Sequence, residues 1–169
     1  NVFPLKLLFL RQIYTILTME ELLHYVWKHK IFPLKELRTS DGRPVEIIDT
    51  GVANPHAGPD FFNAKIKLDG VLWVGNVEIH NQASDWYRHQ HHTNAAYDSV
   101  ILHVAGLIDT EVQRSNGEPI PQMELECPEH IRKNHHERRS TESYPPCYRI
   151  IPQLPSLTIH SWMSALQLE

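Results

Sequence analysis

Residues 60–80, which read DFFNAKIKLDGVLWVGNVEIH, carry the clearest structural pattern of the chain. Between residues 62 and 68 every second residue is apolar, which is typical of a strand with one buried face. Asp69-Gly70 is a favoured two-residue hairpin turn, and residues 71–79 then return as a second apolar strand. The stretch therefore predicts an antiparallel β-hairpin.

The segments on either side of the hairpin indicate an α/β fold. Residues 19–32 have apolar residues at helical spacing, and Pro33 limits that helix. Residues 45–49 are expected to form a strand, residues 84–99 a short helix, chiefly over 94–99, and residues 100–105 a buried strand. This order predicts a mixed sheet flanked by helices.

The expected domain limits follow from the same pattern. Residues 19–108 form the core, and residues 1–18 are an N-terminal extension ahead of a natural start at Met19. Residues 109–169 are an irregular Pro-rich C-terminal extension, the start of a truncated C-terminal region. Within it we expect only a short strand at 123–125 and a final helix from near Ser161.

Composition narrows the functional classes. The chain has 169 residues, with 16 basic and 20 acidic side chains and a formal charge of −4, which excludes a bulk-basic nucleic-acid binder but not a local basic surface. Two cysteines exclude a disulfide scaffold. No apolar run reaches the roughly 18 residues of a membrane span, so we expect a cytoplasmic protein with no membrane partner.

The 12 histidines are the unusual feature of the composition, because histidine titrates near neutral pH and binds metals. Oligomeric state is left open.

Asp60, Glu78 and His80 form the first candidate site. Glu78 and His80 lie two positions apart on a strand and so share a face, and the hairpin returns Asp60 to the same end of the sheet. A strict two-residue turn would place Asp60 on the opposite face, whereas a three-residue turn or one bulge would bring the three together. Paired carboxylates suit Mg²⁺ or Mn²⁺. The plain alternative is an exposed strand end.

The second candidate site is the run WYRHQHH at residues 86–92. Helical spacing would place Arg88 and His92 on one face, whereas an extended chain would align His89 with His91. In either case these groups follow His80 after a short loop and are expected to line the same pocket. They would bind phosphate, donate protons or add metal ligands, unless the run is only a polar helix surface.

The order of elements and the residues Pro59-Asp60 and Glu78-Ile79-His80 together resemble the PD-(D/E)xK nuclease superfamily, over residues 20–104. The resemblance implies a restriction-endonuclease-like core with helix–strand–strand–strand–helix–strand order, and a phosphodiesterase that acts on nucleic acid. Asp60 and Glu78 would hold Mg²⁺ or Mn²⁺. His80 would replace the usual lysine, although neutral imidazole supplies no fixed positive charge.

The same resemblance implies two further roles. Glu20 or Glu21 would match an acidic residue on the first helix, and Arg88 or His89 would assist at the phosphate. The alternative function is a catalytically inactive nuclease-fold module that binds nucleic acid, protein or a structural metal through its His-rich surface.

A second resemblance rests on four strings: GPDF at 58–61, WVGNVEIH at 73–80, SDW at 84–86 and YDSVILHV at 97–104. Together they are similar to an uncharacterised bacterial family, a domain of unknown function. This resemblance implies no activity.

The C-terminal part offers two weaker features. Cys127, His130, His135 or His136, and Cys147 could hold Zn²⁺, although unconnected thiols in a Pro-rich tail are the plainer interpretation. Residues 130–139 form a basic stretch that suits contacts to a phosphate backbone, or an ordinary exposed helix.

Overall fold

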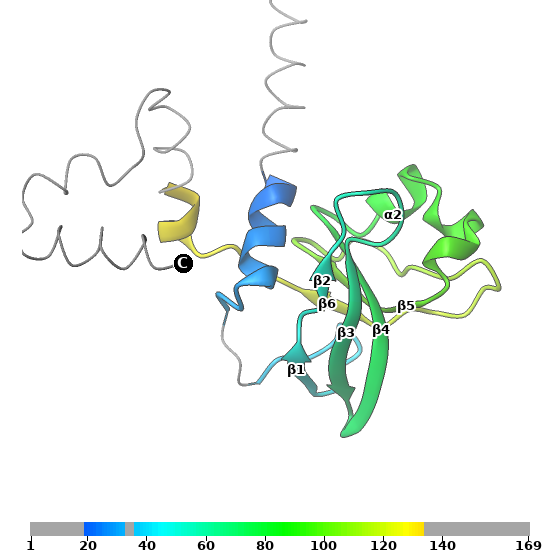
Figure 1. The fold of residues 1–169 in the computed structure, drawn as a ribbon, viewed down its shortest axis with the longest axis horizontal. Helices are drawn as coiled ribbons and strands as arrows, with labels where there is room; N and C mark the ends of the chain where they lie inside the picture. Colours follow the sequence, from blue (N-terminus) through cyan, green and yellow to red (C-terminus); the bar gives the residue numbers. More distant parts are fainter. Residues whose placement is uncertain (1–18, 33–35, 134–169) are drawn as a thin grey trace, which may run out of the picture. The chain divides into compact units, whose positions relative to one another are not determined.

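The computed structural model describes residues 19–32 and 36–133, and these residues contain a curled six-stranded sheet, a half-barrel with a few short helices (Figure 1). The strands are β1 (Val45–Asp49), β2 (Val52–Ala53), β3 (Phe61–Leu68), β4 (Val71–His80), β5 (Val100–Ala105) and β6 (Gln122–Glu124). Their order is β1-β3-β4-β5-β6, and β2 pairs with β3. β1 pairs with β3 and β3 with β4 in antiparallel fashion, whereas β4 pairs with β5 and β5 with β6 in parallel. The expected mixed sheet is confirmed.

The helical segments are shorter than the sequence predicts. Residues 19–28 are helical. The crossover from β4 to β5 consists of α2 (Asp85–Arg88) and two single turns, η1 (His91–Thr93) and η2 (Ala95–Tyr97), in place of one helix over 94–99. Gln90 has a φ of 62° and Asn94 is extended, so both residues interrupt the helical hydrogen bonds. Within the described part of the chain the sheet is therefore covered by short helices only.

The first helix and the strands share the main core. Leu22, Leu23, Val26 and Trp27 are buried against β-strand residues, and the Trp27 Nε1–H donates to the backbone oxygen of Thr50 at 3.1 Å. A second apolar cluster surrounds Trp86. β6 extends the sheet beyond residue 108, and a compact unit of the chain continues to Ile131.

A bulge in β3 decides which residues meet at the end of the hairpin. The Asp69-Gly70 turn pairs Leu68 with Val71, as a two-residue turn requires, but at the other end Phe61 pairs with Val77. The register changes by one residue between Phe61 and Ala64, where Asn63 has a φ of 57°. The offset that the sequence left open is thus a bulge, and it places Asp60 beside Glu78.

The parallel pairing of β4 with β5 brings a second strand to the same place. Glu78 is opposite His103, and His80 is opposite Ala105. Gly75 permits this close approach, because a Cβ at that position would lie 2.4 Å from Cγ2 of Ile101 and 2.9 Å from the backbone oxygen of Ser99. A larger residue would push the two strands apart.

Some expectations concern residues that the structure does not describe. The extension at 1–18, the final helix from near Ser161 and most of the basic stretch at 130–139 lie outside the described residues. Among residues 19–32 and 36–133, no helix is both long enough and apolar enough to cross a membrane.

Candidate metal centre

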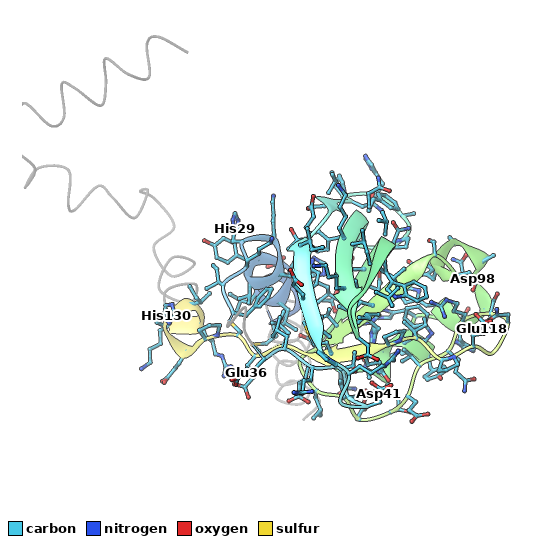
Figure 2. The ribbon with its side chains drawn as sticks, turned by 90° about the horizontal axis from the view of Figure 1, so that it is seen from below. His29, Glu36, Asp41, Asp98, Glu118 and His130 are labelled. Atoms are coloured by element: carbon cyan, nitrogen blue, oxygen red, sulfur yellow. The ribbon has the colours of Figure 1, made fainter. Side chains whose placement is uncertain are left out.

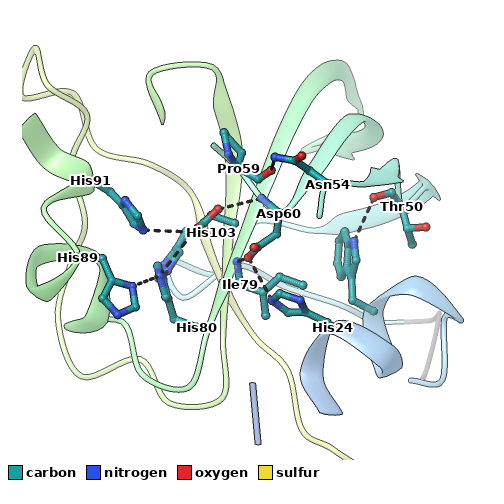
Figure 3. Close-up of polar contacts among 12 residues, drawn as sticks. His24, Thr50, Asn54, Pro59, Asp60, Ile79, His80, His89, His91 and His103 are labelled. Atoms are coloured by element: carbon teal, nitrogen blue, oxygen red, sulfur yellow. Dashed lines mark hydrogen bonds and ion pairs between the residues drawn. The ribbon is translucent and has the colours of Figure 1, made fainter. Parts of the chain in front are cut away.

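Two carboxylates meet where β3 begins and β4 ends. The Asp60 N–H donates to Oε2 of Glu78 at 3.0 Å, and Oδ2 of Asp60 accepts from the N–H of Ile79 at 2.9 Å. Oδ2 of Asp60 also lies 3.2 Å from Nε2 of His24, on the first helix. Figure 3 shows His24 on one side of this carboxylate and the histidines of the crossover on the other. The backbone contacts fix both carboxylates in place.

Three imidazoles gather on the other side of Glu78. Its Oε1 lies 3.2 Å from Nε2 of His91 and 3.6 Å from Nε2 of His80. Nδ1 of His89 lies 3.2 Å from Nε2 of His80 (Figure 3). One nitrogen from each of His80, His89 and His91 lies within 4.8 Å of the others, so this cluster could hold a metal ion. His80 and His91 are buried, whereas His89 is exposed.

The chain reverses locally to place His89 and His91 together. His89 follows α2 and its N–H donates to the backbone oxygen of Asp85 at 2.8 Å. Gln90 then takes a left-handed conformation, with a φ of 62°, before the single turn that contains His91. The His91 ring stacks on Tyr97, with centroids 3.8 Å apart, and meets the edge of buried Trp86. Neither a continuous helix nor an extended chain, the two conformations that the sequence suggested, describes this segment.

A buried polar chain lies behind His80. Nδ1 of His80 is 2.8 Å from Nε2 of His103, whose Nδ1 is 3.4 Å from Nε2 of Gln122. The Gln122 amide also donates to the backbone oxygen of Thr110 at 3.0 Å. Because Nδ1 of His80 is engaged, its Nε2 is the atom that faces Glu78 and His89. The amide nitrogen of Gln122 only donates, so Nε2–H of His103 donates to Nδ1 of His80. A metal ion at Nε2 of His80 therefore requires the Gln122 amide to turn over, so that its oxygen accepts from His103 and His80 donates through Nδ1–H.

Burial shapes the protonation of the centre. Burial and the Asp60 carboxylate raise the pKa of Glu78 to about 9, whereas burial and neighbouring imidazoles lower the pKa of His80 to about 2 and of His103 to about 3. Burial lowers the pKa of His24, but the Asp60 carboxylate outweighs it, so the net shift is upward. Asp60 thus has His24 as its partner, whereas Glu78 keeps its proton and the clustered imidazoles stay neutral; a cation beside Glu78 would favour its ionised form.

The family comparison gives one result. Residues 20–169 match a family described as "Protein of unknown function (DUF2851)". The chain belongs to this family. The expected membership of an uncharacterised family is confirmed, and the family carries no assigned activity. No curated protein and no solved structure matches the chain, so the comparisons give no support to a relation with the PD-(D/E)xK nucleases.

In this DUF2851 domain, most of the residues expected to form the site do come together. Asp60, Glu78, His80, His89 and His91 adjoin one another through the contacts given above. Glu20 also lies near the centre. Burial and the Asp60 carboxylate raise the pKa of its carboxyl and His24 lowers it, and the net shift is upward.

Other expected residues have different surroundings. Glu21 is exposed. His92 packs against Tyr87 and is not among the three clustered imidazoles. The Arg88 guanidinium pairs with the buried carboxylate of Asp85, and its own side chain remains 55 % exposed beside His89.

The alternative zinc site is only partly described. Cys127 is buried in the main core and His130 is exposed. His135, His136 and Cys147 lie outside the described residues, so this zinc site stays a prediction.

Two residues of the centre escaped the sequence analysis. His24 lies one helical turn after Glu20, and that spacing was the signal that could have added it to the site. His103 stands in the otherwise apolar run VILHVA, where a buried histidine needs a polar partner. Its partner could not be predicted, because the register between two parallel strands cannot be read from the sequence of either strand alone.

Proposed function

We propose that this chain is a divalent-metal-dependent phosphodiesterase acting on nucleic acid, with Glu78, His80, His89 and His91 as the residues that hold its ion. The observation that carries the proposal is the position of Oε1 of Glu78, 3.2 Å from Nε2 of His91 and 3.6 Å from Nε2 of His80. One carboxylate and three imidazoles thus converge at one end of the sheet.

The spacing of these atoms suits an ion. Metal–nitrogen bonds of about 2.1 Å place neighbouring ligand atoms roughly 3.0 to 3.4 Å apart in octahedral or tetrahedral centres. Three of the six separations among the four ligand atoms are 3.2, 3.6 and 3.2 Å, and the three imidazole nitrogens lie within 4.8 Å of one another. Nε2 of His91 is also buried and makes no hydrogen bond of acceptable geometry, even to the nearby Glu78. A buried nitrogen without a hydrogen bond is consistent with a metal ligand in the metal-free state.

The donor set favours a particular group of ions. Imidazoles suit Zn²⁺ and other transition metals, whereas all-oxygen sets suit Mg²⁺. A mixed set of three imidazoles and one carboxylate therefore favours Mn²⁺ or Zn²⁺ over Mg²⁺. Bound in this place, the ion would polarise a phosphate and lower the pKa of a coordinated water.

The surrounding residues have separate roles. Asp60 orients Glu78 through its backbone N–H, and we assign its carboxylate, beside His24, to accept the proton of the attacking water in place of the metal-ligand role expected from the sequence. The exposed guanidinium of Arg88 neutralises the phosphate. His80 is a metal ligand in this proposal and does not replace a catalytic lysine.

The choice of a nucleic-acid phosphodiester rests on two supports. The described elements contain the order expected of a restriction-endonuclease-like core, with a helix, the antiparallel strands β1, β3 and β4, short helical turns and the parallel strand β5, to which the short strands β2 and β6 are added. Cationic side chains also border the acidic centre, with Arg88 beside His89 and Lys28 close to Asp60.

The direct test is cleavage of labelled single-stranded and duplex DNA and RNA with Mn²⁺, Zn²⁺ or Mg²⁺. Wild-type protein should cleave at least one substrate with Mn²⁺ or Zn²⁺, and Glu78→Gln should lose at least about 100-fold of that activity. Glu46→Gln is the matched control, because Glu46 is an exposed glutamate that pairs with Lys67 on the sheet. Equal activity in the wild type and Glu78→Gln would overturn the proposal. Metal binding without cleavage of any substrate would favour the inactive binding module.

A further inference from the structure

A groove of about 310 Å³ opens beside Asp60, on the side away from the imidazole cluster. Its walls come from the first helix and from the segment after β2, and its lining includes Tyr25, Lys28, Asn54 and Phe61. Asp60 belongs to both the groove and the candidate centre. A molecule that reached the centre with one of its groups could therefore rest another in this groove.

The helical wall of the groove is aromatic and basic. The wall consists of His24, beside Asp60, and of Tyr25 and Lys28, which lie three positions apart on one side of the helix; Tyr25 is 43 % exposed, and His29 lies next to it outside the lining. The rings of Tyr25 and His29 lie 4.5 Å apart, and His29 is on the outer surface of the helix (Figure 2). Lys28 is exposed. The rest of the lining is mainly uncharged.

We propose that this groove binds the nucleotide next to the scissile phosphate of a single-stranded nucleic acid. This inference rests on the proposed phosphodiesterase function. The base stacks on Tyr25, since an exposed aromatic ring accepts the face of any base. The ammonium group of Lys28 contacts a flanking phosphate. The uncharged lining beside Tyr25 suits a base better than a second phosphate.

The arrangement of charge favours a strand with alternating groups. Asp60 repels a phosphate unless a cation lies beside it, so the reacting phosphate belongs on the side of the imidazole cluster. Lys28 offers a separate positive charge within the same groove. A single strand supplies a base between two phosphates. A duplex keeps its base faces stacked, and Tyr25 could not reach them.

The test measures binding without cleavage. Fluorescence anisotropy of a labelled oligothymidylate of about eight nucleotides is followed with metal-free protein in EDTA, at several salt concentrations. Tyr25→Ala should weaken binding between about 5-fold and 150-fold, whereas Tyr25→Phe should bind within about 2-fold of the wild type. Lys28→Gln should reduce the dependence of log K on log salt by about 0.7. Lys65→Gln is the control, because Lys65 is an exposed lysine of β3 outside the groove.

Each outcome decides the matter. The groove assignment is overturned if the wild type does not bind the oligonucleotide, or if Tyr25→Ala and Lys28→Gln both bind it as tightly as the wild type does. Tighter binding of the matching duplex overturns the choice of a single strand. Binding that needs Tyr25 and Lys28, in a protein that cleaves nothing with any metal, supports the groove and overturns the catalytic proposal. If the protein cleaves nucleic acid and these two substitutions leave the cleavage unchanged, the catalytic proposal is supported and the groove assignment is overturned.

Discussion

Asp60 and Glu78 are joined across two strands by the Asp60 N–H, which donates to Oε2 of Glu78 at 3.0 Å. The return contact is made by the N–H of Ile79, which donates to Oδ2 of Asp60 at 2.9 Å. The two carboxylates are therefore held by the backbone and do not depend on flexible side chains. Oε1 of Glu78 is left to face the imidazoles, and together with the contact between His80 and His89 it links the hairpin to the crossover.

The register that sets Asp60 beside Glu78 should be essential to the centre but not to the fold. Inserting one glycine between Asp60 and Phe61 leaves Phe61 opposite Val77 but moves Asp60 opposite Ile79, to the face away from Glu78. We expect cleavage with Mn²⁺ to fall by at least about 100-fold, because the carboxylate of Asp60 is the proposed base. Asn63→Gly should keep the bulge and the activity, and gain up to about 1 kcal/mol in the free energy of unfolding, because glycine adopts a positive φ freely. An insertion variant that cleaves like the wild type would contradict this prediction.

The stability of the metal-free protein should depend on pH through Glu78. Its pKa is raised to about 9 in the folded state, so between pH 4.5 and 9 the folded chain keeps a proton that the unfolded chain releases. The contribution of Glu78 to the free energy of unfolding is therefore present at low pH and is lost as pH rises. Glu78→Gln should remove at least about 1 kcal/mol of the fall in unfolding free energy between pH 5 and 8, measured with urea.

The buried histidines impose the opposite trend at acid pH. His80 and His103 have pKa values lowered to about 2 and about 3, so below pH 6.5 only the unfolded chain takes up their protons, and stability falls as pH falls. His103→Leu should weaken this acid sensitivity. If the wild type and His103→Leu lose the same unfolding free energy between pH 7 and 5, burial of neutral imidazoles is not the cause.

His103 should also matter for metal binding, although it lies behind His80. His103→Leu leaves Nδ1 of His80 without its 2.8 Å partner, and loss of such an outer contact typically reduces metal affinity between about 10-fold and 100-fold. Competition with a chelator measures this change. His92→Gln is the control, because His92 packs on Tyr87 outside the cluster and its removal should change the affinity by less than about 2-fold.

Gly75 should be needed for the pairing of β4 with β5. Gly75→Ala places a methyl group 2.4 Å from Cγ2 of Ile101 and 2.9 Å from the Ser99 oxygen, so we expect a loss of about 2 kcal/mol or more in unfolding free energy. Ile101→Ala should relieve only part of this loss in the double variant, because the contact with the backbone oxygen remains. A fully stable Gly75→Ala protein would contradict the strand register.

The hairpin and the order of elements could be predicted because their signals are local. Alternating residues on β3 and the Asp69-Gly70 turn define two strands without reference to anything else. The centre could be predicted only in outline, since its geometry depends on a bulge, a left-handed Gln90 and the parallel register of His103 with Glu78. Each of these is set by packing between segments distant in the sequence. The helix expected over 94–99 is only a single turn, Ala95–Tyr97, for the same reason.

The X-ray absorption spectrum of the protein loaded with one equivalent of Zn²⁺ or Mn²⁺ tests the proposed centre most directly. We predict one tightly bound ion per chain, with scattering from three imidazoles and a carboxylate oxygen at about 2.0 to 2.2 Å, and loss of that signal in Glu78→Gln. An ion surrounded only by oxygen atoms, or a spectrum that Glu78→Gln leaves unchanged, would show that Glu78, His80, His89 and His91 do not form a metal centre.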